Sequence, residues 1–209
     1  MAVSQVSLPF DRAQFSKYLG TRSLVLVGMM GVGKSSVGRR LAQALNLPFV
    51  DADKAIEEAA NRTIVEIFDT YGEAHFRDGE KRVIQRLLTE GPQVLATGGG
   101  AFMSEETRSE ITENGISIWL SAELDILFNR VRRKPTRPLL QQPNPEKVLA
   151  DLLEVRNPVY ALADVTVTSR DVPHEVVVSD ILEALKHHMP GEHVDANQHN
   201  TKDQTGPEA

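Results

Sequence analysis

One glycine-rich segment, residues 28–35, constrains the fold of this chain more than any other feature. It reads GMMGVGKS and matches G-x-x-x-x-G-K-[ST], the pattern of a phosphate-binding loop. The continuous apolar run at 24–27 is typical of a strand buried on both faces, and apolar residues four apart predict a helix over 35–46. Because such a loop binds phosphate between a strand and a helix, the segment predicts an α/β fold of the P-loop type.

Each residue type in this loop has a physical role. Gly31 and Gly33 let backbone N–H groups curl around an anion, and the N-terminus of the following helix adds partial positive charge. Lys34 supplies a charge to the β- and γ-phosphates, and the Ser35 hydroxyl is placed to bind Mg²⁺. The alternative is a tight structural turn, but the predicted strand and helix around the loop favour nucleotide binding.

The rest of the chain alternates between apolar runs and helical patterns, which is the signature of a parallel sheet covered by helices. Further strands are predicted at 47–50, 94–96, 116–120 and 165–168, and helices at 54–60, 64–71, 80–88, 105–113, 124–131, 146–157 and around 178–185. The sequence thus predicts a three-layer α/β P-loop NTPase fold, with a five-stranded parallel sheet flanked by helices.

The overall composition excludes several classes of site and partner. Without a cysteine in its 209 residues, the chain can form no disulfide, thiolate zinc site or cysteine nucleophile. A net charge of −6 would repel nucleic acid, and no apolar stretch reaches the length of a membrane span. We therefore expect a cytoplasmic protein without nucleic acid or membrane as a partner. We also expect a monomer, since no apolar stripe is left over for an interface.

Among P-loop proteins, the sequence favours a small-molecule kinase. A GTPase would need an N-K-x-D segment, which is absent, and the D-x-x-G match at 69–72 is interpreted as a helix end capped by Gly72. Motor ATPases usually carry an apolar strand ending in Asp, whereas the strand at 94–96 ends in Thr97 and three glycines. The one predicted strand followed by a carboxylate is 47–50, with Asp51 next.

Asp51 and Asp53 form the second informative pattern. In an extended segment, residues two apart project to the same side, so both carboxylates would lie at the sheet edge where α/β folds bind ligands. One carboxylate beside Mg²⁺ and the other beside a substrate hydroxyl would suit a kinase. The alternative is that Asp53 simply caps the N-terminus of the next helix.

Three further features each leave two interpretations open. Arg77 and Glu80 form either a solvated surface ion pair or an oriented arginine that binds a substrate carboxylate. Residues 98–100 are all glycine, and a plain turn seldom needs three, so a ligand or another backbone is expected to approach closely. The basic residues around Arg137, in a segment with four prolines, are either a solvated charge run or a mobile lid at about 131–145 that carries charge onto the phosphoryl group.

Taken in order, these motifs resemble shikimate kinase, within the nucleoside-monophosphate-kinase-like P-loop group. The resemblance covers about residues 24–185 and rests on the phosphate loop, Asp51-x-Asp53, Gly72-Glu73 with Phe76-Arg77, Gly98-Gly99-Gly100, Arg137-Pro138-Leu139-Leu140 and Arg156-x-Pro158-x-Tyr160. It implies ATP-dependent phosphorylation of the 3-hydroxyl of shikimate, giving shikimate 3-phosphate and ADP in chorismate and aromatic amino-acid biosynthesis.

The resemblance also implies roles for individual residues, with Lys34, Asp53 and Arg137 as the catalytic ones. The implied ATP-binding residues are Gly31, Val32, Gly33, Lys34, Ser35, Ser36, Arg130 (near adenine) and Arg137 (at the γ-phosphate). One Mg²⁺ per subunit would be held by Ser35, with Asp51 acting through the water shell of the ion. The implied shikimate-binding residues are Asp53 for the hydroxyls, Arg77 and Arg156 for the carboxylate, and Gly98, Gly99 and Gly100 for the pocket wall.

Two segments lie outside the resemblance, and two other functions stay open. The domain prediction is an N-terminal extension at 1–21, a P-loop kinase domain at 22–189 and a disordered tail at 190–209. A kinase for another polyhydroxy acid such as gluconate is the nearest alternative, although the paired arginines and triple glycine argue against it. A catalytically silent nucleotide-dependent binding module is the other, although it would have no need to keep Lys34, Ser35, Asp51 and Arg137.

Overall fold

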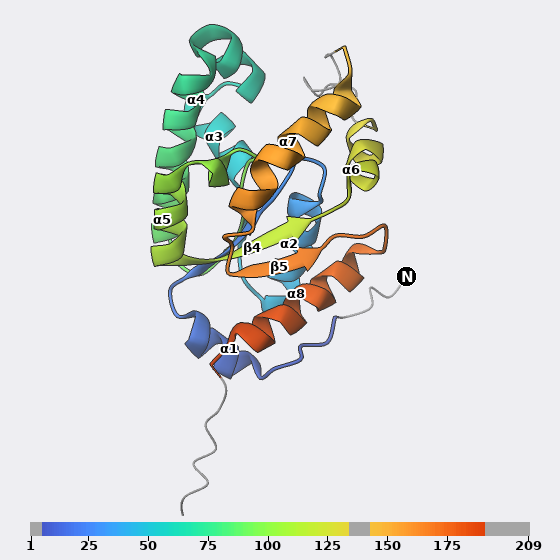
Figure 1. Ribbon diagram of the computed structural model, residues 1–209. Coiled ribbons are helices and arrows are strands. Elements are labelled where there is room, and N and C mark those ends of the chain that lie inside the picture. The colour runs from blue at the N-terminus through green and yellow to red at the C-terminus, as the bar shows by residue number, and fades with distance from the viewer. Residues whose placement is uncertain (1–5, 134–142, 191–209) are drawn as a thin grey trace, which may run out of the picture.

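The computed structural model describes residues 6–133 and 143–190 (Figure 1). Its five strands form one parallel sheet in the order β2-β3-β1-β4-β5. The strands are β1 (Ser23–Val27), β2 (Phe49–Asp51), β3 (Val94–Ala96), β4 (Gly115–Ser121) and β5 (Val165–Thr168). The predicted fold class is therefore confirmed, and all five strands lie within two residues of their predicted bounds.

The central strand shows why this sequence forms a three-layer structure. Every residue of β1 is buried, and successive side chains point to opposite faces of the sheet. Leu24 and Leu26 join one apolar core, whereas Val25 and Val27 join a second core on the other face. An uninterrupted apolar strand can be buried in this way only if helices cover both faces.

Helices cover each face of the sheet and its carboxyl edge (Figure 1). The first core is covered by α1 (Arg12–Leu19), α2 (Lys34–Leu45) and α8 (His174–His188). The second core is covered by α4 (Ile64–Thr89) and α5 (Glu105–Asn114), which lie side by side. The remaining elements are α3 (Ala52–Ala60), the 3₁₀ turn η1 (Ala101–Met103), α6 (Leu124–Val131) and α7 (Pro145–Tyr160).

The long helix α4 was predicted as two separate helices, at 64–71 and 80–88. It runs from Ile64 to Thr89 and is interrupted only at Gly72, whose φ of 80° and ψ of 173° are not helical. A positive φ favours glycine, so the expected helix end at Gly72 is confirmed. A second helical segment starts directly afterwards, and Arg77 therefore lies inside it rather than before it.

The N-terminal extension contains a helix that the sequence analysis did not predict. Phe15 and Leu19 of α1 are buried in the first core, and Phe15 stacks on Phe10 with ring centroids 4.7 Å apart. The Arg12 guanidinium donates to the carbonyl oxygen of Ala44 at the end of α2. At least the part of the extension from about residue 6 onward thus belongs to the packed domain.

Several predictions fall on residues that the structure does not describe. They are most of the predicted lid (134–142), with Arg137 in it, and the tail at 191–209.

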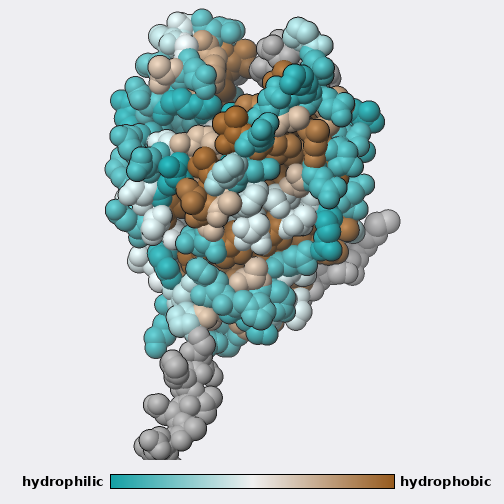
Figure 2. All heavy atoms as spheres, viewed as in Figure 1, coloured by the Kyte–Doolittle hydropathy of each residue, from teal (hydrophilic) through white to brown (hydrophobic). Residues whose placement is uncertain are grey.

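Among the described residues, no helix is long and apolar enough to cross a membrane. The surface over α4 and α5 is largely hydrophilic, whereas apolar side chains gather around α7, near which Val155 and Leu162 are exposed (Figure 2). The monomer was expected because no apolar stripe was left over for an interface, and this exposed apolar patch speaks against that argument.

Candidate active site

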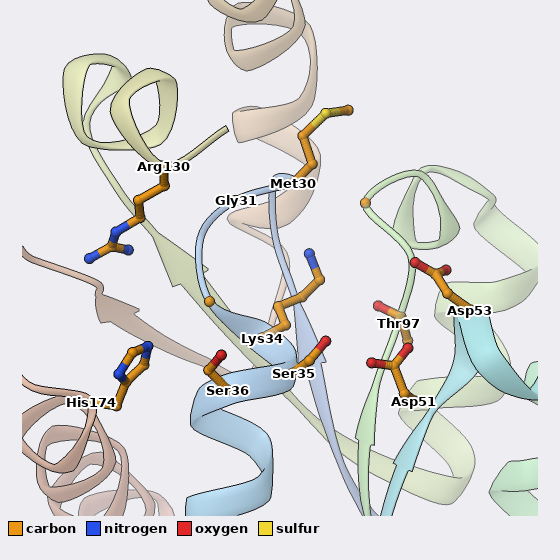
Figure 3. Close-up of a pocket in the computed structure, with 12 residues that line it drawn as sticks. Met30, Gly31, Lys34, Ser35, Ser36, Asp51, Asp53, Thr97, Arg130 and His174 are labelled. Atoms are coloured by element: carbon orange, nitrogen blue, oxygen red, sulfur yellow. The ribbon is translucent and has the colours of Figure 1, made fainter. Parts of the chain in front are cut away.

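A cavity of about 250 Å³ opens at the carboxyl ends of the central strands (Figure 3). It brings together nine of the residues predicted from the sequence: Gly31, Gly33, Lys34, Ser35, Ser36, Asp51, Asp53, Gly99 and Arg130. Met30, Thr97 and His174 also line it, and the sequence analysis did not select them. Residues from five separate segments of the chain therefore meet at one site, at the sheet edge where α/β folds bind ligands.

The phosphate loop adopts a conformation that requires its glycines. Gly31 has a φ of 85°, and a Cβ there would lie 2.7 Å from a methyl carbon of Val131. Gly33 has a φ of 107° and caps the N-terminus of α2. The backbone N–H groups at this helix start have no partner within the helix, so the loop presents donors to an anion.

Lys34 is buried at the centre of this loop. Its Nζ donates to the carbonyl oxygens of Gly28, at 2.6 Å, and Met29, at 3.1 Å. The ammonium group is thereby held inside the curve of the loop, where its charge faces the cavity (Figure 3). A phosphate bound by the loop would lie next to this charge.

Arg130 is fixed at one end of the cavity by three hydrogen bonds. Its Nη1 donates to the Val32 carbonyl oxygen at 3.2 Å and to Ser169 Oγ at 2.9 Å, and its Nη2 donates to the Arg170 carbonyl oxygen at 2.6 Å. Because these bonds fix the plane of the guanidinium, it can serve as a rigid stacking surface beside the phosphate loop.

Asp51 and Asp53 line the opposite end, but not in the conformation that the sequence predicted. The expectation of an extended Asp51-x-Asp53 segment was wrong, because α3 begins at Ala52 and Asp53 lies in its first turn. Capping by Asp53 was also wrong, since Asp51 holds the N-cap position without a side-chain cap bond. Both carboxylates nevertheless reach the cavity (Figure 3). A negative charge in the first turn is favourable because it faces the positive end of the helix dipole.

The three glycines at 98–100 create space for charged side chains. A Cβ on Gly98 would lie 2.6 Å from Glu80 Oε1 and 2.9 Å from Asp53 Oδ1. A Cβ on Gly100 would lie 2.6 Å from both terminal nitrogens of Arg77. At Gly99 the neighbours are the backbone of the phosphate loop and, at 3.8 Å, Arg156 Nη1. The glycine segment thus forms the wall around which these four side chains converge. Another backbone approaches closely at Gly99, as expected, whereas at Gly98 and Gly100 the close neighbours are charged side chains.

Arg77 and Glu80 form an ion pair that is not a solvated surface pair. Arg77 Nη1 lies 2.7 Å from Glu80 Oε2, and the Glu80 side chain is only 3% exposed. Arg77 Nη2 also contacts Glu73 at 3.0 Å. Burial raises the pKa of Glu80 above its ordinary value, while Arg77 opposes that rise. The pair orients the arginine, which excludes the solvated surface pair, and the binding of a substrate carboxylate by Arg77 stays a prediction.

One oxygen of Glu80 has no partner among the described residues. Its Oε1 atom is buried and makes no hydrogen bond there, and it lies against Gly98 close to Asp53. A buried acceptor without a partner is costly, and a ligand hydroxyl or a water molecule could satisfy it. The wall of the pocket therefore offers hydrogen-bond acceptors for the hydroxyl groups of a ligand. Next to them lie cationic side chains that can bind a carboxylate.

Arg156 and Tyr160 reach the glycine segment from α7. Arg156 Nη1 donates to the Gly99 carbonyl oxygen at 3.3 Å, and the buried Tyr160 hydroxyl donates to the same oxygen. The Tyr160 ring stacks near Trp119 and Phe102. Spacing of four residues places both donors on one helix face, so α7 holds the pocket wall in position.

We expect Tyr160→Phe to raise KM for the acceptor about 2- to 10-fold, with little change in KM for ATP. The substitution keeps the stacked ring but removes the hydrogen bond that positions Gly99. Steady-state kinetics with each substrate varied would measure the two constants. Tyr71→Phe, which changes an exposed ring on α4, is the matched control. Equal increases in both KM values would contradict a local role.

The three missed residues differ in how well the sequence could have revealed them. Thr97 directly precedes the triple glycine, and its hydroxyl donates to the Leu26 carbonyl oxygen, which ties β3 to β1 beside the phosphate loop. Met30 is one of the variable positions within the loop pattern. His174 lies more than a hundred residues from the loop, and no motif marks it.

Comparisons with known proteins identify the family of this chain. A family model described as shikimate kinase matches residues 30–186. The curated shikimate kinase of Bradyrhizobium diazoefficiens is 56% identical over 193 residues, covering 91% of this chain and 93% of the relative. That of Rhodopseudomonas palustris is 57% identical over 179 residues, covering 86% and 88%. A solved structure, shikimate kinase from Acinetobacter baumannii in complex with shikimate, matches with a TM-score of 0.77 at 36% identity, covering 82% of this chain and 97% of that chain.

The matched range includes α2, the two aspartates, the glycine segment and the arginines of α4 and α7. The family match and the similarity to curated relatives extend over far more than half of the chain. The chain therefore belongs to the shikimate kinase family of ATP-dependent kinases.

Proposed function

We propose that this protein transfers the γ-phosphoryl group of ATP to the 3-hydroxyl of shikimate. The products would be shikimate 3-phosphate and ADP, in chorismate and aromatic amino-acid biosynthesis. The observation that carries the proposal is the pocket wall at residues 98–100, where Asp53, Arg77 and Arg156 converge within reach of the phosphate loop. An acceptor with both hydroxyls and a carboxylate fits one aspartate beside two arginines.

The proposed chemistry assigns a task to each group. Arg77 and Arg156 hold the acceptor carboxylate, which sets the reacting hydroxyl near Asp53. Asp53 accepts the hydroxyl proton as the oxygen attacks the γ-phosphorus, and the bond to the β,γ-bridging oxygen breaks to release ADP. Lys34 stabilises the negative charge that spreads over the transferring group. Arg137, proposed to meet the γ-phosphate, lies outside the described residues, and its role stays a prediction.

The donor set at Ser35 and Asp51 fits one Mg²⁺ ion per subunit. No group of three or more His, Cys, Asp or Glu that could hold a metal occurs among residues 6–133 and 143–190. Mg²⁺ at phosphoryl-transfer sites usually takes one or two protein oxygens and completes its shell with phosphates and water. One hydroxyl and one carboxylate beside the phosphate loop match that coordination preference. When bound with ATP, the ion would neutralise charge on the β- and γ-phosphates.

The test is ADP release from Mg-ATP, followed by coupled assay, with shikimate and gluconate offered separately to the purified full chain. Turnover with shikimate alone would support the acceptor and the reaction class together. Turnover with gluconate instead would favour the related polyhydroxy-acid kinase. If ADP binds but neither acid raises ADP release, the acceptor assignment and the pair of Arg77 and Arg156 as its clamp are both wrong.

The remaining statements stay predictions. We propose residues 22–189 as the kinase domain, with residues 1–21 as an extension whose helix α1 packs on it. The lid at 131–145, the disordered tail at 190–209, the cytoplasmic location, the monomeric state and the absence of nucleic-acid or membrane partners are likewise proposed from the sequence. Sedimentation of the full chain would measure the oligomeric state.

A further inference from the structure

A second cavity, the α3–α4 groove, lies between these two helices, and the proposed reaction does not use it (Figure 1). Its volume is about 440 Å³, and none of its described lining residues also lines the cavity at the phosphate loop. Ile56 from α3 and Ile67, Phe76 and Val83 from α4 form much of its apolar surface. Small-molecule sites are mostly apolar cavities of roughly 300–1,000 Å³ with a few polar groups, so the groove has the size and lining of a ligand site.

The charge of the groove is opposite to that of the whole chain. The chain has 29 acidic and 23 basic residues, yet the groove is lined by Arg62 and Arg82 and by no acidic residue of the described chain. Neither arginine forms an ion pair with another described residue. Arg62 lies near Glu66, but the Glu66 carboxylate already accepts hydrogen bonds from the N–H and hydroxyl of Thr63. The groove therefore favours a ligand with a carboxylate and disfavours one with an ammonium group.

Aromatic side chains line the groove beside these arginines. The ring centroids of Tyr71 and His75 lie 4.8 Å apart, and Tyr71 is half exposed. The guanidinium carbon of Arg62 lies over the Tyr71 ring, 5.8 Å from its centroid. The buried Phe76 contributes a further ring. A flat ring can stack against such side chains while a carboxylate attached to it reaches a guanidinium.

Gly79 keeps the groove open. It lies inside α4, where only Gly72 departs from helical geometry, so its backbone conformation does not require glycine. A Cβ on Gly79 would meet nothing within 4 Å, so close packing does not require glycine either. A glycine inside a helix is destabilising relative to alanine, and open space in the groove is what this one provides. We propose that the α3–α4 groove is a second binding site, for a small aromatic acid that carries a carboxylate and no ammonium group.

The experiment compares three probes that share a phenyl ring and a three-carbon chain. They are 3-phenylpropionate, 3-phenylpropan-1-ol and L-phenylalanine, each titrated calorimetrically into the full chain without nucleotide or acceptor. We expect 3-phenylpropionate to bind at one site, and the alcohol to bind at least about 10-fold more weakly because it has no charge for the arginines. Phenylalanine should also bind more weakly than the acid, because no carboxylate in the groove meets its ammonium group.

Variants of α4 locate the site. Gly79→Leu should abolish binding of 3-phenylpropionate by filling the groove, whereas Gly79→Ala, the matched control, should leave binding nearly unchanged. Arg82→Gln should weaken binding about 5- to 20-fold, since it removes the charge and keeps much of the side chain. Arg86→Gln changes an exposed arginine one turn further along α4, outside the groove, and should have no effect. Circular dichroism would check that each variant is folded.

The other outcomes would overturn the inference. Binding that is lost in Arg156→Ala but kept in Gly79→Leu would place the acid in the acceptor pocket. Equal affinity for the acid and the alcohol would mean that the arginines do not recognise the ligand. If no probe binds and Gly79→Leu lowers the mass of the full chain in sedimentation, the groove is an interface between two copies. If no probe binds and the mass is unchanged, the groove is not a site for this class of ligand. Because the titrations contain neither ATP nor an acceptor, their result does not depend on whether shikimate is the substrate.

Discussion

Asp53→Asn should lower kcat for phosphorylation about 10²- to 10⁴-fold while leaving ADP affinity nearly unchanged. Asparagine has nearly the same shape, but it cannot accept the proton of the acceptor hydroxyl. Asp53 lies at the acceptor end of the cavity, beside Gly98, and away from the arginine that borders the other end. Steady-state kinetics and ADP titration on the same preparation would separate the two effects.

The control for this substitution is Asp78→Asn, which makes the same change of charge at an exposed position on α4. The KM for the acceptor, measured in the same assays, distinguishes proton transfer from binding. If Asp53 only binds the acceptor hydroxyls, KM for the acceptor should rise with kcat little changed. If Asp53→Asn lowers kcat by less than 10-fold, Asp53 is not the proton acceptor.

Arg77→Ala should affect both acceptor binding and stability. Removing a guanidinium that binds a carboxylate should raise KM for the acceptor about 10- to 100-fold, with ADP binding nearly intact. The substitution also leaves the Glu80 carboxylate, which is 3% exposed, without its partner. We expect the free energy of unfolding to fall by about 1–3 kcal/mol, which denaturant unfolding would measure.

The stability loss should depend on pH in a defined direction. The pKa of Glu80 is already raised by burial, and without Arg77 nothing close by opposes that rise as strongly. The folded state then binds a proton more tightly than the unfolded state, so the loss should shrink as pH falls from neutrality toward the ordinary carboxyl value of 4.5. A loss that stays constant over this range would show that the buried charge is not its cause.

The double variant Arg77→Ala with Glu80→Gln separates stability from binding. Glutamine removes the buried charge, so most of the lost stability should return. The acceptor KM should stay high, because no guanidinium is restored. If ADP binding weakened as much as acceptor binding in either variant, the assignment of Arg77 to the acceptor would be wrong.

The features that could be predicted from sequence are those encoded by neighbouring residues. The phosphate loop was identified correctly because its glycines, Lys34 and Ser35 are consecutive and lie between an apolar strand and a periodic helix. The five strands were found for the same reason, since each is a short apolar run. Local patterns failed where the backbone changes direction within a few residues. The start of α3 at Ala52 was placed too late, and the gap predicted at 72–79 within α4 was too long, because only Gly72 departs from helical geometry there.

The acceptor pocket depended on contacts that no local pattern encodes. Sequence indicated Arg77, Arg156 and the three glycines separately, but only the packing of α4 and α7 against the sheet brings them within a few ångströms. The burial of Glu80, which decides that its pair with Arg77 is not a surface pair, is likewise a property of that packing. Helix α1 was not predicted because its apolar residues are few and its position depends on packing against α2 and α8.

By itself, the sequence determined the fold class, the phosphate loop and the kind of chemistry, because those depend on residue types at fixed short spacings. Only the tertiary structure decided which charged side chains share a cavity, which of them are buried, and that His174 lies opposite the aspartates. Burial and electrostatic environment arise from segments distant in the chain, so they exist only once the helices have packed on the sheet.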